Sequence, residues 1–137
     1  MKYLLDTHIM LWLVGESDKV PDKVNEIISS KSKEDEIYYS IISIWEAARK
    51  RIVHPDKITK LTPKELADFC YYAKIYELPL KLEHVYTLET LTRPDDAPPH
   101  KDPFDRILIS QAKSEHMTFI THDDRLTAYN EPCILYV

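Results

Sequence analysis

The residues best suited to chemistry are four acidic side chains, each where a predicted strand ends or a predicted helix begins: Asp6, Glu46, Asp105 and Asp123. Ligands of an open parallel sheet bind beyond the carboxyl ends of the strands, so the fold could bring these positions into one cleft. Clustered carboxylates repel one another unless a cation neutralises them, and hard oxygen ligands suit Mg²⁺ or Mn²⁺. One or two such ions can activate a water and stabilise the leaving oxygen at phosphorus. The pattern therefore predicts phosphodiester hydrolysis.

Each acid also has a purely structural explanation. Asp6 could cap a helix, and Ser43 and Glu46 have the spacing of a capping box. Asp102 could cap the helix that begins at Pro103, with Asp105 favoured there by the helix dipole. Residue by residue these explanations compete evenly with the functional one, and only the joint pattern favours a metal site.

Composition excludes several other kinds of site. Gly15 is the only glycine, so neither a phosphate-binding P-loop nor a dinucleotide fingerprint can exist. The six histidines are scattered without metal-ligand spacing. Cys70 and Cys133 are isolated, form no CxxC motif, and are expected to be buried free thiols.

Charge and hydropathy bear on partners and location. A net charge of −5 argues against a general nucleic-acid binder, although without the four carboxylates it would be only −1. No apolar run approaches the ~18 residues that span a bilayer. We therefore expect a cytoplasmic protein with no membrane contact.

Predicted strands alternate with predicted helices along the whole chain. This order predicts one α/β domain over residues 1–137, with a mainly parallel sheet covered on both faces. Pro79 restricts the third strand to an edge or a strand end. The predicted strands span residues 2–5, 37–40, 76–80, 117–121 and 133–137, and the main predicted helices span 6–14, 43–51, 62–75, 83–91, 102–115 and 124–129. A capping box at Thr62 and Glu65 should open the helix at 62–75.

Four sequence runs resemble those of a known family. They are LLDTHIMLW, SIISIWEAARK, HKDPFDRILISQA and FITHDDRLTAY, and they span residues 4–129. In this order they are similar to the PIN-domain endonucleases, and most closely to the VapC-type toxins of VapBC toxin–antitoxin pairs. The combination of HxDPFDRxLxxQA with an upstream SxWE is specific, whereas a lone DT or WE would not be.

The resemblance assigns roles residue by residue. It makes Asp6, Glu46, Asp105 and Asp123 the catalytic, metal-holding acids, with Asp102 and Asp124 the less favoured choices beside the third and fourth. Thr121 matches a small hydroxyl residue that precedes the fourth acid. Supporting roles around the acids fall to a group of polar neighbours, namely Thr7, Ser43, Asp102, Thr121 and Asp124.

The resemblance also implies a three-layer α/β/α fold, Mg²⁺ or Mn²⁺, cleavage of RNA and inhibition of translation. It implies a cognate antitoxin that blocks the site, and a homodimer. One segment departs from the family pattern: residues 50–58 lack the glycine that relatives often carry after the SxWE helix. Contacts made by that loop are therefore less certain to follow the family.

Basic residues lie close to the acids in sequence. Arg49 and Lys50 follow Glu46, while Lys101 and Arg106 flank Asp105. They could contact RNA phosphates, or they could belong to ordinary solvated helix faces. Aromatic residues could stack on RNA bases, but we expect Trp12 and Trp45 to be core residues.

Two other functions compete with the nuclease. A non-catalytic binding module with the same fold would normally have lost one of the acids, and none is lost. A phosphoacceptor domain would need an aspartate after a middle strand, and the third strand here ends in Leu78-Pro79-Leu80-Lys81.

Overall fold

The computed structural model describes all residues from 1 to 137 as a five-stranded sheet between two layers of helices. The strand order is β3-β2-β1-β4-β5, and all four pairings are parallel. The strands are β1 (Lys2–Leu5), β2 (Glu36–Ser40), β3 (Tyr76–Leu78), β4 (Thr118–Thr121) and β5 (Ile134–Tyr136). The predicted parallel sheet is confirmed, and every carboxyl strand end lies on one edge.

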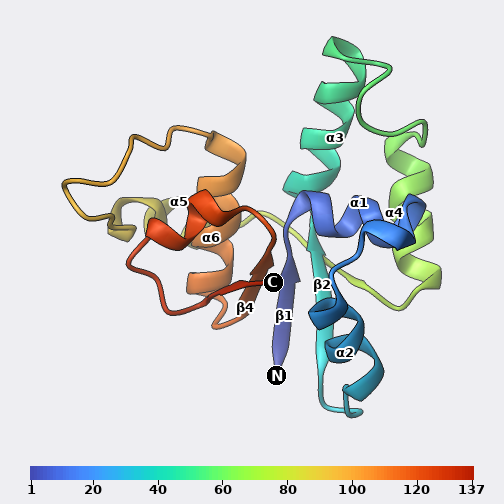
Figure 1. Cartoon of the computed structure of the whole chain (residues 1–137), viewed down its shortest axis with the longest axis horizontal. Helices are drawn as coiled ribbons and strands as arrows, with labels where there is room; N and C mark the ends of the chain where they lie inside the picture. Colours follow the sequence, from blue (N-terminus) through green and yellow to red (C-terminus); the bar gives the residue numbers. More distant parts are fainter.

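The helices divide between the two faces of the sheet. Figure 1 shows α5 and α6 on one side of the strands and α1, α2 and α4 on the other. The helices are α1 (Thr7–Gly15), α2 (Asp22–Ser30), α3 (Ile41–Val53), α4 (Pro63–Tyr72), α5 (Leu82–Thr87) and α6 (Pro103–Ser114), with short 3₁₀ turns η1 (Ser17–Lys19), η2 (Leu88–Thr90) and η3 (Asp124–Ala128). The helix predicted over 83–91 is thus split between α5 and η2.

Two hydrophobic cores lie on opposite faces of the sheet because successive strand residues point in opposite directions. Leu4 and Phe119 join one core with Leu108 of α6. Leu5 and Ile120 join the other core, on the side of α1, α2 and α4. The three-layer α/β/α arrangement is therefore confirmed.

The beginning of α3 differs from the prediction. Ser40 is the N-cap and its hydroxyl accepts from the backbone N–H of Ile42 at 3.0 Å, so the predicted capping box of Ser43 and Glu46 is wrong. The helix starts earlier, which places Ser43 inside the first turn facing the protein interior. The capping box of Thr62 and Glu65 is confirmed at α4.

Both tryptophans are less buried than predicted. Trp45 is 59% exposed and packs only one side against Phe104, with ring centroids 4.9 Å apart. Trp12 is half-buried at the margin of a core. Cys70 is buried and Cys133 half-buried, and both are free thiols. No helix is both long and apolar enough to cross a membrane.

Candidate active site

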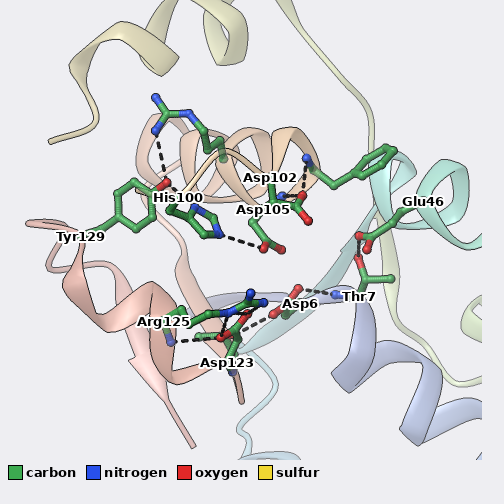
Figure 2. Close-up of polar contacts among 12 residues, drawn as sticks. Asp6, Thr7, Glu46, His100, Asp102, Asp105, Asp123, Arg125 and Tyr129 are labelled. Atoms are coloured by element: carbon green, nitrogen blue, oxygen red, sulfur yellow. Dashed lines mark hydrogen bonds and ion pairs between the residues drawn. The ribbon is translucent and has the colours of Figure 1, made fainter. Parts of the chain in front are cut away.

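The four predicted acids come together at the carboxyl edge of the sheet, although they lie far apart in sequence. Asp6 follows β1 and caps α1, and Asp123 follows β4 and caps η3. Glu46 lies in α3 directly after β2, and Asp105 lies in the first turn of α6. Figure 2 shows all four side chains around one space. For Asp6, Glu46 and Asp123 the short connections of a parallel sheet explain this placement, because each lies in the segment that begins where its strand ends. Asp105 reaches the same edge because α6 begins there and runs back to the start of β4.

Asp6 is held by two short hydrogen bonds. Its carboxylate accepts from the backbone N–H of Thr7 at 2.7 Å and from the Thr121 hydroxyl at 2.6 Å. Thr121 also accepts from the backbone N–H of Asp123 at 3.0 Å, so one hydroxyl links two acids. Burial, and more weakly the charge of Glu46, raise the pKa of Asp6 to about 6 in spite of these bonds.

Glu46 is buried and fixed from two sides. The Thr7 hydroxyl donates to its Oε1 at 2.7 Å and lies 2.9 Å from the Ser43 hydroxyl. Lys50, one helical turn later, donates to Oε2 at 2.6 Å. The predicted supporting residues Thr7 and Ser43 therefore contact each other beside an acid, and a predicted RNA-binding lysine pairs with that acid.

Asp105 has the most perturbed pKa of the cluster. Burial is the first cause and the negative charges around it the second, and together they raise the pKa to about 8. The charges that contribute come from the other acids, in the order Asp6, Asp102, Glu46 and Asp123. A buried carboxyl surrounded by other carboxylates in this way attracts a cation.

A histidine outside the acid cluster also contacts Asp105. His100 Nε2 lies 3.3 Å from Asp105 Oδ2, while Nδ1 lies 2.7 Å from the hydroxyl of Tyr129 (Figure 2). Burial and the nearby Arg93 lower the pKa of His100. Both shifts disfavour the charged form of each partner in this contact.

Asp102 lies beside Asp105 but serves as a helix cap, and Asp124 stands outside the cluster. Asp102 caps α6, and its Oδ1 accepts from the backbone N–H groups of Phe104 and Asp105 at 2.9 and 3.1 Å. This is the capping role predicted for it. The side chain of Asp124 is exposed and makes no hydrogen bond.

Asp123 already has a cationic partner. Arg125 donates through Nη2 and Nε to both oxygens of its carboxylate, the shortest contact being 2.7 Å. This pairing lowers the pKa of Asp123. Two of the four acids are thus neutralised by the protein's own cations, Glu46 by Lys50 and Asp123 by Arg125.

The donor chemistry fits a divalent ion, although the side chains are not preset for one. No group of three or more His, Cys, Asp or Glu side chains stands at metal-binding geometry. The atoms that face the site are nevertheless carboxylate oxygens, which Mg²⁺ and Mn²⁺ prefer. Neither Asp6 nor Asp105 pairs with a lysine or arginine, and burial is the main cause that raises the pKa of both.

The remaining predicted basic residues divide between the site and the surface. Arg106 donates to the Tyr129 hydroxyl at 3.2 Å, and this hydroxyl also contacts His100. Lys101 lines a cavity beside them. Arg49 is exposed and makes no hydrogen bond or ion pair. Lys50, in contrast, lies within the cluster itself.

Beside the acids lies an open cavity of about 430 Å³, here called the basic cavity. It is lined by Arg93, Pro98, Pro99, His100, Lys101, Asp102, Asp124, Arg125 and Ala128. The sequence did not point to Arg93, His100 or Tyr129 as site residues. The only signal available was the position of His100 in the HKDPFD run, five residues before Asp105.

Comparison with known proteins identifies the fold independently. A family model described as PIN domain matches residues 3–132 of the chain. No curated protein sequence matches it.

Among solved structures, the fold is similar to that of VapBC2 from Rickettsia felis, which was solved bound to a DNA fragment from the promoter of VapBC2. The TM-score is 0.71 and the sequence identity 16%, and the match covers 100% of this chain and 98% of that chain. DNA-bound VapBC from Salmonella typhimurium has a TM-score of 0.64, at 14% identity over 100% and 97%. VapBC-1 from nontypeable Haemophilus influenzae has a TM-score of 0.63, at 18% identity over 93% of each chain. At these identities the likeness concerns the fold.

Proposed function

Because this chain belongs to the PIN-domain family, we propose that it is a metal-dependent endoribonuclease that hydrolyses RNA phosphodiester bonds. One observation above all supports the proposal. Four acids that lie far apart in sequence gather at one sheet edge, and burial together with the charges of the neighbouring acids raises the pKa of Asp105 to about 8. Only Glu46 and Asp123 have a lysine or arginine partner, so the cluster suits a divalent ion and the phosphate that the ion attracts.

In this proposal Asp6, Glu46, Asp105 and Asp123 would hold one or two Mg²⁺ or Mn²⁺ ions. A bound ion would supply a hydroxide-forming water and positive charge for the leaving oxygen. The chain's own residues do the positioning. Thr121 orients Asp6, and Thr7 orients Glu46, each through a hydrogen bond of 2.6–2.7 Å. Ser43 supports Thr7.

Lys50 and Arg125 have a second task in this mechanism. Each neutralises one acid in the free protein, at 2.6 and 2.7 Å. When a cation takes over that neutralisation, the ammonium and the guanidinium become available to phosphate oxygens beside the acids. Arg125 suits this exchange because it is exposed and its planar guanidinium matches phosphate as well as carboxylate.

We further propose that the nuclease is a VapC-type toxin, which inhibits translation in the cytoplasm and is blocked by a cognate antitoxin. The similarity of its fold to proteins named VapBC supports this assignment. Large exposed apolar side chains on α3 and α4 supply surface of the kind that protein partners cover. They include Ile41, Trp45, Ile52, Phe69 and Tyr72. A homodimer is expected as well.

The decisive experiment is cleavage of total RNA by the purified protein, with Mg²⁺ or Mn²⁺ and with chelator, comparing wild type and Asp105→Asn. Wild type should cut RNA only with metal, and the variant should not cut. Asn removes one negative charge and almost no volume, so the fold should persist, which circular dichroism would verify.

Failure of folded, metal-loaded wild type to cut any RNA would instead favour the binding-module alternative. Cleavage that survives in Asp105→Asn would leave the nuclease but remove the proposed site. A short reading frame directly upstream of the gene, whose product copurifies with this protein and suppresses cleavage, is the expected result for the antitoxin.

A further inference from the structure

The basic cavity lies directly against the carboxylate cluster. His100 lines the cavity and contacts Asp105, and Arg125 lines it and binds Asp123. We propose that this cavity binds a backbone phosphate of the RNA strand, one that flanks the bond to be cleaved. The proposal rests on the nuclease assignment and adds to it a substrate site outside the acids.

Two basic side chains of the cavity are open to an anion. Arg93, Lys101 and Arg125 line it together with Asp102 and Asp124, and because Arg125 is paired with Asp123, the cations without an ion pair are Arg93 and Lys101. Asp102 is occupied in part, since its Oδ1 accepts two backbone N–H groups as the cap of α6. Lys101 is exposed and forms no ion pair, so its ammonium is free for a ligand.

Arg93 is the best-positioned donor in the cavity. Its guanidinium lies over the ring of Tyr129, with the central carbon 4.7 Å from the ring centroid, and Nη2 donates to the carbonyl of Pro98 at 2.6 Å. Its other terminal nitrogen, Nη1, is buried and has no acceptor. A buried donor without an acceptor is costly, and a phosphate oxygen would satisfy it once the guanidinium turns this nitrogen toward the cavity.

His100 and Arg125, which line the cavity and also contact the acids, define the path of the RNA strand. A strand with one phosphate against Arg93 and Lys101 runs past His100 and Arg125 toward the acids. Phosphate contacts of this kind fix the register of a nucleic acid without reading its sequence. The cavity therefore holds RNA in place for cleavage and does not choose the base.

Two measurements test the cavity. The first is steady-state cleavage of a single-stranded oligoribonucleotide with Mn²⁺ over a salt series by wild type, Lys101→Gln, Arg93→Gln and a control, Lys33→Gln. Lys33 is equally exposed but lies before β2, at the opposite edge of the sheet. Lys101→Gln should raise KM several-fold with little change in kcat, and should reduce the salt dependence of log KM by about 0.7, the value for one contact to a single strand.

The second measurement is an NMR titration in which inorganic phosphate or uridine 5′-monophosphate is added to the protein kept metal-free by a chelator. Amide shifts should concentrate at Arg93, His100 and Lys101 and weaken in Lys101→Gln. Active enzyme with unchanged KM in both cavity variants, or a titration without shifts at these residues, would overturn the cavity proposal alone. If wild type cleaves no RNA, the nuclease assignment fails, and localised phosphate shifts would still establish the cavity as an anion site.

Discussion

A single hydroxyl, that of Thr121, connects two of the four acids. It donates to Asp6 and accepts from the backbone of Asp123, and it is completely buried. Groups that orient metal ligands in this way typically contribute about 10- to 100-fold to metal affinity or activity. Thr121→Val preserves the shape and removes the hydroxyl.

We therefore predict that Thr121→Val lowers Mn²⁺ affinity and cleavage by about 10- to 100-fold, measured by calorimetry and by RNA cleavage. Thr121→Ser keeps the hydroxyl and should recover most of the loss. Equal losses in both variants would assign Thr121 a packing role only.

Asp102 and Asp105 offer a second comparison between neighbouring residues. Asn caps helices about as well as Asp, so Asp102→Asn should retain both the cap and most of the cleavage. Asp105→Asn should abolish cleavage, because Asp105 faces the other acids. The test compares the cleavage rates of the two variants, with their melting temperatures as controls for folding. A greater loss of cleavage in Asp102→Asn than in Asp105→Asn would show Asp102 to be the functional acid.

At this scale the sequence could predict the acids but not their surroundings. Each acid stands just after a strand or in the first turns of a helix, which is visible in the order of residues. The environment of Asp105 is not visible there, because it depends on how residues 93–101 fold back to place His100 between Asp105 and Tyr129. Trp45 was mispredicted for a similar reason: its size suggested burial, but α3 turns it outward.

Among the secondary-structure elements, α3 depends most on a contact outside itself. Its cap, Ser40, also donates a 2.5 Å hydrogen bond to Gln111 of α6, and both residues are fully buried. Removing the hydroxyl would uncap the helix and leave a buried amide oxygen unpaired. Thr62, the cap of α4, has neither a buried partner nor a long-range contact.

Ser40→Ala should therefore lower the free energy of unfolding by about 2–3 kcal/mol, and Thr62→Ala by about 1 kcal/mol. Urea unfolding followed by circular dichroism measures both values. If the two variants lose the same amount, the Ser40–Gln111 hydrogen bond adds nothing beyond the cap.

The same contact explains why the start of α3 was mispredicted. Ser43 and Glu46 have the local spacing of a capping box, but tertiary structure sets the helix register. Ser40 is drawn inward by Gln111, and Ser43 by Thr7. At α4 no such competition exists, and the capping box predicted from spacing is the one that forms.

For the whole molecule, the acid cluster makes stability depend on pH, and under the proposed function on metal as well. The pKa of Asp105 is raised to about 8 and that of Asp6 to about 6, both from 3.8. Between pH 3.8 and about pH 8 these two groups together bind more protons in the folded state than in the unfolded state, so their contribution to stability falls as pH rises. Asp123, whose pKa is lowered, acts in the opposite direction at lower pH, and His100, whose pKa is lowered from 6.5, opposes the trend near that pH. The larger shift at Asp105 sets the net direction.

In the presence of a chelator, the protein should accordingly be less stable toward unfolding at pH 8 than at pH 5. Mn²⁺ at pH 8 should restore stability, because it binds only the folded state. Asp105→Asn should flatten the pH dependence. Urea titrations at both pH values provide the test, and a stability that rises from pH 5 to pH 8 in chelator would contradict the assigned pKa directions.

The central position of β1 has a consequence for how the protein is made. Asp6 is synthesised 115 residues before its hydrogen-bond partner Thr121. Because β1 pairs directly with β4, a nascent chain cannot assemble the four acids until β4 and Asp123 have emerged from the ribosome. The order of synthesis therefore delays assembly of the proposed site, and a product terminated before β4 should lack it.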